Sequence, residues 1–204
     1  MSGLDTLIAK SLDITIKENL GKKTLQKVED RLFEKYGINL TQAITDFTKL
    51  DGVLREFFGD GAEGLEKQFL ENIVTLEEAK SQNPNWVTIE DPTLSKLVLE
   101  SFGDDDKKNI LNSVLDEPRI ISEILEVSKI PQTSGYRKIN SLIDSGLLIA
   151  QGHIITHDGK KVSKYRTIFE NVTISIEKNK VVVKVLLAKE SIEKSSVIQV
   201  VQCR

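Results

Sequence analysis

The chain has 204 residues, of which 39% are hydrophobic and 29% are charged, as in an ordinary globular protein. It contains no run of about 18 apolar residues, so we expect no transmembrane helix and no membrane partner. Asp5 and Lys10 interrupt the apolar stretch near the N-terminus, which argues against a signal peptide and predicts a cytoplasmic protein. Because Cys203 is the single cysteine, an internal disulfide is excluded.

The net charge of −3 conceals two halves of opposite sign. Residues 1–106 carry 12 Lys and Arg against 21 Asp and Glu, which is a net charge of −9. Residues 107–204 carry 16 against 10, which is a net charge of +6. This asymmetry predicts two domains with different roles, and the basic domain is the candidate for binding a polyanion.

Residues 1–79 are predicted to form an acidic helical domain. Apolar residues recur at helical spacing in four stretches, which are 4–19, 25–36, 41–58 and 65–76. Gly21 and Gly37 are placed to end the first two helices, and Asp51-Gly52 is the candidate break in the third stretch. A loop is expected at the glycines that follow, which are Gly59, Gly61 and Gly64. We expect this domain to mediate dimerisation or to receive a signal, and to offer the surface for any protein partner.

Residues 80–103 are predicted to form a linker and a connecting helix. Breaker residues mark the boundary, namely Asn83, Pro84, Asn85 and Pro92. Between them, residues 86–89 predict a short extended piece. A helix is expected over 94–102 with Gly103 as its end, and Trp86 is expected to pack against it.

Residues 104–204 are predicted to form a winged helix-turn-helix with an extra C-terminal β-hairpin, which makes the whole chain an α+β protein. The run of aspartates at 104–106 can cap a first helix, and apolar spacing over 120–127 predicts a second. After a turn at Lys129-Ile130, Pro131 is placed to begin a third helix, 131–145, which Gly146 would end.

After this third helix the hydrophobic pattern changes from helical to alternating. Strands are expected over 148–156 and 162–169, joined by a turn that contains Asp158-Gly159, which is a strong hairpin signal. A second hairpin is expected over 172–187, with Lys178-Asn179 in its turn. The pattern of residues 190–204 does not distinguish a helix from a strand.

The third helix and the first hairpin carry the side chains expected of a DNA-binding surface. The N-terminal half of a helix in the major groove presents side chains to base edges. The residues expected on the outer face of helix 131–145 are Gln132, Thr133, Tyr136, Arg137 and Asn140. Arg137 is expected to read guanine and Gln132 or Asn140 to read adenine, whereas Ser134 and Lys138 suit phosphates. The basic wing, 157–166, is expected to hold phosphates through Lys160, Lys161, Lys164 and Arg166.

The segment IPQTSGYRKINSLIDSGLL resembles the recognition helix of archaeal winged-helix regulators related to the arsenic-repressor type. The continuation HDGKKVSKYRTIFENVTISIEKNKVVVKV resembles the wing and extra hairpin of these regulators. The resemblance covers residues 105–188 and implies a transcriptional regulator that binds double-stranded DNA as a homodimer. Gly135 departs from the family pattern, which has a small aliphatic residue there, so the first turn is either loose or very close to a neighbour.

A second resemblance concerns the N-terminal half. Residues 20–78, which include LREFFGDGAEGLEKQFLENIV, resemble a small helical output domain of ammonia-oxidising archaea. For the homodimer implied by the first resemblance, the apolar faces of helices 4–19 and 94–102 are the candidate interface. The alternative function is a winged-helix interaction module that docks on the transcription machinery or on a signalling partner.

We expect no enzymatic activity, because no nucleophile is paired with a base and the glycines at 59–64 lack the lysine of a phosphate-binding loop. The two histidines, His153 and His157, would lie about 13 Å apart on one strand, too far to share a metal ion. We therefore expect neither a metal site nor a cofactor.

Overall fold

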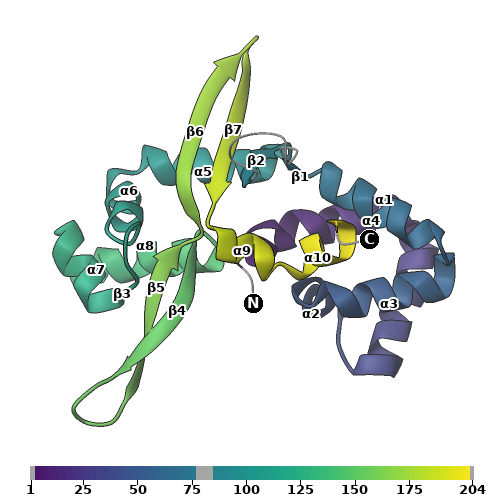
Figure 1. The fold of residues 1–204 in the computed structure, drawn as a ribbon, viewed down its shortest axis with the longest axis horizontal. Coiled ribbons are helices and arrows are strands. Elements are labelled where there is room, and N and C mark those ends of the chain that lie inside the picture. The colour runs from purple at the N-terminus through teal and green to yellow at the C-terminus, as the bar shows by residue number, and fades with distance from the viewer. Residues whose placement is uncertain (1–2, 77–84, 203–204) are drawn as a thin grey trace.

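The computed structural model describes residues 3–76 and 85–202, which form ten helices and seven strands (Figure 1). The protein is an α+β protein in which an N-terminal helical region is followed by antiparallel sheets. The expected linker start at residue 80 and the thiol of Cys203 lie outside the described residues. None of the described helices is long and apolar enough to cross a bilayer.

Four helices form the N-terminal region. They are α1 (Gly3–Tyr36), α2 (Leu40–Thr45), α3 (Phe47–Phe58) and α4 (Gly61–Glu71). Gly21 interrupts α1 with a φ of 67° and a ψ of 157°, and so separates its two segments as predicted. Gly37, with a φ of 66°, follows the end of α1, and its N–H donates to the carbonyl of Phe33. Both positions need the left-handed backbone that glycine adopts without strain.

Three predictions for this region are wrong. The stretch 41–58 breaks at Asp46, between α2 and α3, whereas Asp51-Gly52 lies inside α3, where Asp51 is buried and paired with Arg55. The loop expected over 59–64 is confined to its start, because only Gly59 takes a positive φ and α4 begins at Gly61. The helix expected to continue to residue 76 ends at Glu71, and a strand follows it. In each case contacts within the folded chain override the local pattern.

That strand, β1 (Val74–Leu76), belongs to a four-stranded antiparallel sheet with the order β1-β2-β7-β6. The other members are β2 (Trp86–Ile89), β6 (Phe169–Glu177) and β7 (Lys180–Leu187). The predicted second hairpin is therefore β6–β7, with Lys178 and Asn179 at positive φ in its turn. Strand β2 precedes helix α5 (Pro92–Gly103) and pairs with β7 of the C-terminal hairpin, with Trp86 opposite Leu186.

The following segment contains three helices and a three-stranded sheet. In chain order these are α6 (Asp105–Asn112), β3 (Arg119–Ile120), α7 (Ile121–Ser128), α8 (Gln132–Asp144), β4 (Leu148–Ile155) and β5 (Lys161–Thr167). The sheet has the order β3-β5-β4, so the short β3 joins the long hairpin at its β5 edge. Pro131 is the residue before α8 rather than its first residue, and Gly146, with a φ of 75°, follows its end.

The C-terminal residues, whose pattern was ambiguous, form two short helices, α9 (Lys189–Glu193) and α10 (Ser196–Gln202). Helix α10 packs against α3 and α4 of the N-terminal region. The N-terminal end of α1 is also internal, since Leu4, Ile8 and Leu12 are completely buried. Helix 4–19 therefore does not expose the apolar face expected of a dimer interface.

Figure 1 shows the resulting arrangement in space. Helices α6, α7 and α8 lie at one end of the molecule, and α2, α3 and the second segment of α1 lie at the other. The β4–β5 and β6–β7 hairpins project from the middle in opposite directions. A single cluster of buried apolar residues includes members from α1 to α10 and so links both ends.

Candidate nucleic-acid interface

Helix α8 is anchored by its inner face. Gly135, Ile139 and Leu142 are buried there, and the helix packs against α6 and α7. A Cβ atom added to Gly135 would lie 2.1 Å from Cδ2 of Leu125 on α7, so this first turn is close to a neighbour and not loose. Glycine at position 135 thus has a packing reason, because a larger residue would force the Leu125 side chain to move.

The outer face of α8 is exposed as predicted. The side chains on it belong to Gln132, Thr133, Tyr136, Arg137 and Asn140, all of which are exposed. Tyr136, the largest of these side chains, is 45% exposed. An exposed row of one guanidinium, two amides and two hydroxyls can donate and accept hydrogen bonds at base edges, which is the chemistry of major-groove readers.

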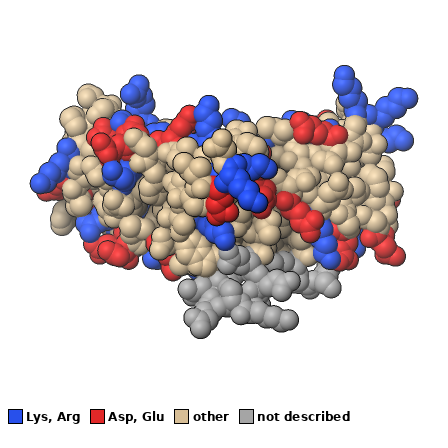
Figure 2. Space-filling view, turned by 90° about the horizontal axis from the view of Figure 1, so that it is seen from above, with Lys and Arg blue, Asp and Glu red and all other residues tan. Residues whose placement is uncertain are grey.

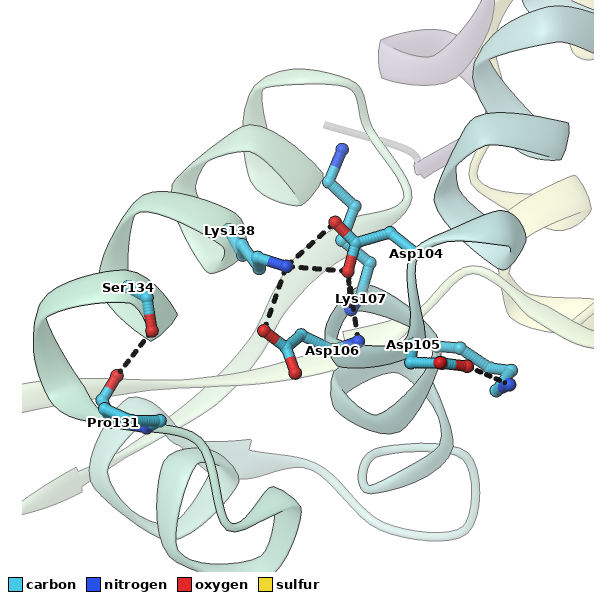
Figure 3. A network of polar contacts seen from close by, with 8 residues as sticks. Asp104, Asp105, Asp106, Lys107, Pro131, Ser134 and Lys138 are labelled. Carbon is cyan, nitrogen blue, oxygen red and sulfur yellow. Dashed lines mark hydrogen bonds and ion pairs between the residues drawn. The ribbon is translucent and has the colours of Figure 1, made fainter.

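Lys138 is on a different side of α8 and is held by acidic partners (Figure 3). Its Nζ donates to both carboxylate oxygens of Asp104, at 2.7 and 2.8 Å, and lies 2.9 Å from Asp106. Only 18% of the Lys138 side chain is exposed. The hydrogen bonds to Asp104, and next those to Asp106, raise the pKa of Lys138. The same contact with Lys138 is the main cause that lowers the pKa of Asp104.

Asp104 also caps α6, as the aspartate run predicted, since it accepts hydrogen bonds from the backbone N–H groups of Asp106 and Lys107. The carboxylate of Asp104 therefore caps the N-terminus of α6 and also holds α8 in place through Lys138. The expected phosphate contact of Lys138 does not fit this geometry, because the ammonium group already has two carboxylates. Its partners lie more than 30 residues earlier, so the helical spacing around Lys138 contains no signal for them. Ser134 also has an internal partner, the carbonyl of Pro131.

The turn of the β4–β5 hairpin is well ordered by its own polar groups. The Thr156 hydroxyl donates to Asp158 and accepts from the N–H of Lys160, and Gly159 takes a φ of 77°. Hydrogen bonds from Thr156, and next from Lys160, lower the pKa of Asp158. Lys160 is 79% exposed although it lies 3.0 Å from Asp158, and the next residue, Lys161, is also exposed.

The four basic residues of the predicted wing do not share one surface. Lys161 lines a shallow pocket of 310 Å³ with Tyr136 of α8 and Tyr165 of β5. Because side chains alternate along a strand, Lys164 and Arg166 point to the other face of β5. Arg166 lies near α9, where Lys194 and, more weakly, Arg166 lower the pKa of Glu190. The structure thus brings Lys161 to the outer face of α8 and places Arg166 away from it.

The face from which the β6–β7 hairpin projects carries charges of both signs. Figure 2 shows acidic and basic side chains intermixed over this face, with no broad area of one sign. Among residues 3–76 and 85–202, no group of three or more His, Cys, Asp or Glu side chains is placed to hold a metal ion. The exposed outer face of α8 and the tip of the β4–β5 hairpin, with Lys160 and Lys161, form a candidate surface for a polyanion.

No protein-family model matches the chain, and searches of the curated proteins and of the solved structures found no match.

Proposed function

We propose that this protein is a DNA-binding transcriptional regulator and that residues 104–167 form a winged helix-turn-helix. The element order α6, β3, α7, α8, β4, β5 and the sheet order β3-β5-β4 support this fold. The observation that carries the proposal is the exposed outer face of α8, a helix whose opposite face is buried. A helix presented in this way next to a projecting hairpin can enter a major groove while the hairpin contacts the backbone.

In this proposal α8 reads the bases. Arg137 donates two hydrogen bonds to guanine, and Gln132 or Asn140 pairs with adenine in the same groove. Lys160 and Lys161 at the hairpin tip hold phosphates, and Tyr136 of the reading face lines the same pocket as Lys161. Lys138 does not contact DNA but positions α8 through Asp104 and Asp106.

Homodimerisation is proposed to use the β6–β7 hairpin. Ile174, Ile176 and Val181 remain 37%, 75% and 44% exposed. They share one face of the hairpin, because Ile176 lies opposite Val181 and alternate residues of a strand point the same way. Clusters of exposed apolar side chains mark interaction surfaces.

A second copy of the chain fits the outer edge of this hairpin. Strand β6 is the last strand of its sheet, and its backbone groups on that edge can pair with another strand. Its charged residues, Glu170 and Glu177, lie near its two ends, so an antiparallel copy centred on Thr173 places each glutamate opposite an apolar residue. The pairing therefore avoids opposing like charges.

A salt titration tests the DNA-binding proposal. Binding of the organism's promoter duplexes is measured against random duplexes, and log affinity is expected to fall by about 0.9 per log unit of salt for each neutralised phosphate. Arg137→Ala should lose sequence preference, whereas Lys161→Gln should weaken both duplexes about equally. Lys22→Gln, at an exposed lysine of α1, is the matched control and should leave the salt slope unchanged. Equal binding of promoter and random duplexes by the unmodified protein would refute base reading and favour the alternative, docking on a protein partner.

Sedimentation equilibrium tests the dimer. The unmodified protein is expected to sediment as a dimer and Ile176→Lys as a monomer, because a buried unpaired ammonium opposes association. Ile155→Lys is the control, since Ile155 is similarly exposed, at 72%, but lies on the opposite hairpin. A monomeric unmodified protein, or a dimeric Ile176→Lys variant, would contradict this interface.

A further inference from the structure

A cavity of 960 Å³ lies between α1, α5 and α8. Small-molecule sites typically enclose about 300–1,000 Å³ and are mostly apolar with a few polar groups. The apolar part of this cavity comes from Leu7 of α1 and from Leu94 and Leu97 of α5. Arg137 and Asn140 of α8 line it as well, so the cavity adjoins the proposed reading face.

Two tight contacts hold the walls of this cavity in place. A Cβ atom at Gly146 would lie 2.6 Å from the backbone nitrogen of Leu7, so the end of α8 is pressed against α1 without room for a side chain. The bonds between Lys138 and Asp104 tie α8 to the residue that directly follows α5. The cavity is therefore present before any ligand binds, which lowers the entropic cost of binding.

Two of the cationic side chains that line the cavity favour an anionic ligand. Lys96 is 3.7 Å from Glu100 on its own helix. By contrast, Lys10 and Arg137 have no acidic partner within 4.0 Å among residues 3–76 and 85–202. The other carboxylate, Asp144, lies seven residues beyond Arg137 on α8, or about 10 Å along the helix axis. An unpaired guanidinium is the group that best binds a carboxylate.

We propose that this cavity binds a small amphipathic carboxylate, with its apolar body against Leu7, Leu94 and Leu97 and its carboxylate at Arg137. Ligand binding rests on the cavity alone, whereas its consequence rests on the proposed function. Arg137 and Asn140 cannot contact a ligand in the cavity and base edges at the same time. The ligand therefore competes with DNA and releases the regulator from its site.

Isothermal titration calorimetry of the full chain with three ten-carbon probes tests the site. Decanoate is expected to bind with one site per chain, decanol at least tenfold more weakly, and decylammonium without saturation. The order follows because only decanoate can accept charge-assisted hydrogen bonds from the unpaired Arg137. Absence of decanoate binding, or tighter binding of decylammonium at the Asp144 end, would overturn the proposal.

Variants locate the binding site within the chain. Leu97→Trp fills the cavity and should lower decanoate affinity at least tenfold, whereas Leu99→Trp on the same helix lies outside the cavity and should not change it. Lys10→Gln should weaken decanoate binding severalfold, and Lys22→Gln, its match elsewhere on α1, should have no effect. Unchanged binding by Leu97→Trp would show that decanoate binds elsewhere and would overturn the assignment.

Promoter binding at increasing decanoate tests the competition. The apparent Kd for DNA should rise in proportion to decanoate in the unmodified protein and stay constant in Leu97→Trp, which keeps the reading face intact. An apparent Kd that does not respond in the unmodified protein would overturn the competition. If no duplex binds specifically while decanoate binds as described, the proposed function fails and the cavity site is upheld.

Discussion

At the residue scale, Asp5 is a carboxylate with only 1% of its surface exposed. The hydroxyl of Ser195 and both the N–H and the hydroxyl of Ser196 donate to it. It thereby joins the start of α1 to the start of α10, although 190 residues separate Asp5 from Ser195. Burial raises the pKa of Asp5, and the hydrogen bonds from Ser195 and Ser196 oppose this effect.

This pKa predicts how stability changes with pH. Because the pKa of Asp5 is raised in the folded state, the contribution of Asp5 is greatest below the unfolded value of 3.8 and falls as pH rises through the folded pKa. The difference in free energy of unfolding between the unmodified protein and Asp5→Asn should therefore decrease over this range. Urea denaturation at a series of pH values measures it. A difference that grows with pH would mean that the hydrogen bonds outweigh burial.

At the element scale, the packing of α8 on α7 depends on Gly135. Gly135→Ala gains helix propensity of about 1 kcal/mol but forces Leu125 to move, and overpacking typically costs about 1–3 kcal/mol. We expect a net loss of about 1 kcal/mol in the free energy of unfolding, and no loss when Gly135→Ala is made in a Leu125→Ala background and compared with Leu125→Ala alone. The control is Gly64→Ala in α4, which should stabilise the protein, because apart from its own helix no atom of the described residues lies within 4 Å of the added Cβ. A stabilised Gly135→Ala variant would show that α7 yields easily.

Elements with local signals were predictable from the sequence. Gly146 ends α8 and Lys178-Asn179 turns the second hairpin, because each needs a positive φ that few residues adopt. The outer face of α8 followed in the same way from helical periodicity. The proximity of this face to the cavity was not predictable, because the residues that line the cavity come from three helices that lie far apart in the sequence.

Elements that depend on distant partners could not be predicted. Residues 74–76 continue a helical pattern, yet they form β1 because β2 is available to pair with them. Residues 196–202 lack a clear pattern, and α10 forms where α3 and α4 offer an apolar surface. The acidic partners of Lys138 were missed for the same reason. Pairing between segments far apart in the chain contributes free energy that a local stretch of sequence does not reveal.

At the scale of the whole molecule, the buried core continues across residue 104, where the sequence predicts a domain boundary. Strand β7 contributes Val183, Val185 and Leu187 to the buried cluster. It pairs with β2 and packs against α5, both of which precede residue 104. The elements that pair with and pack against β7 therefore lie outside the predicted DNA-binding domain, although α6, α7, α8, β4 and β5 are contiguous in sequence.

Two fragments test where the cooperative unit begins. In a fragment of residues 104–204, β7 loses β2 and α5, and the burial of each of its aliphatic side chains, worth about 1.5–3 kcal/mol, is lost with them. A two-stranded hairpin is marginal in water, so amide hydrogen exchange should show β6–β7 and α10 unprotected while α6–α8 and β4–β5 keep protection. A fragment of residues 86–204 restores β2 and α5, and protection of β7 should return before that of α10, which still lacks α3 and α4. Full protection of β6–β7 in the shorter fragment would instead establish residue 104 as a true domain boundary, with the N-terminal half as a separable partner.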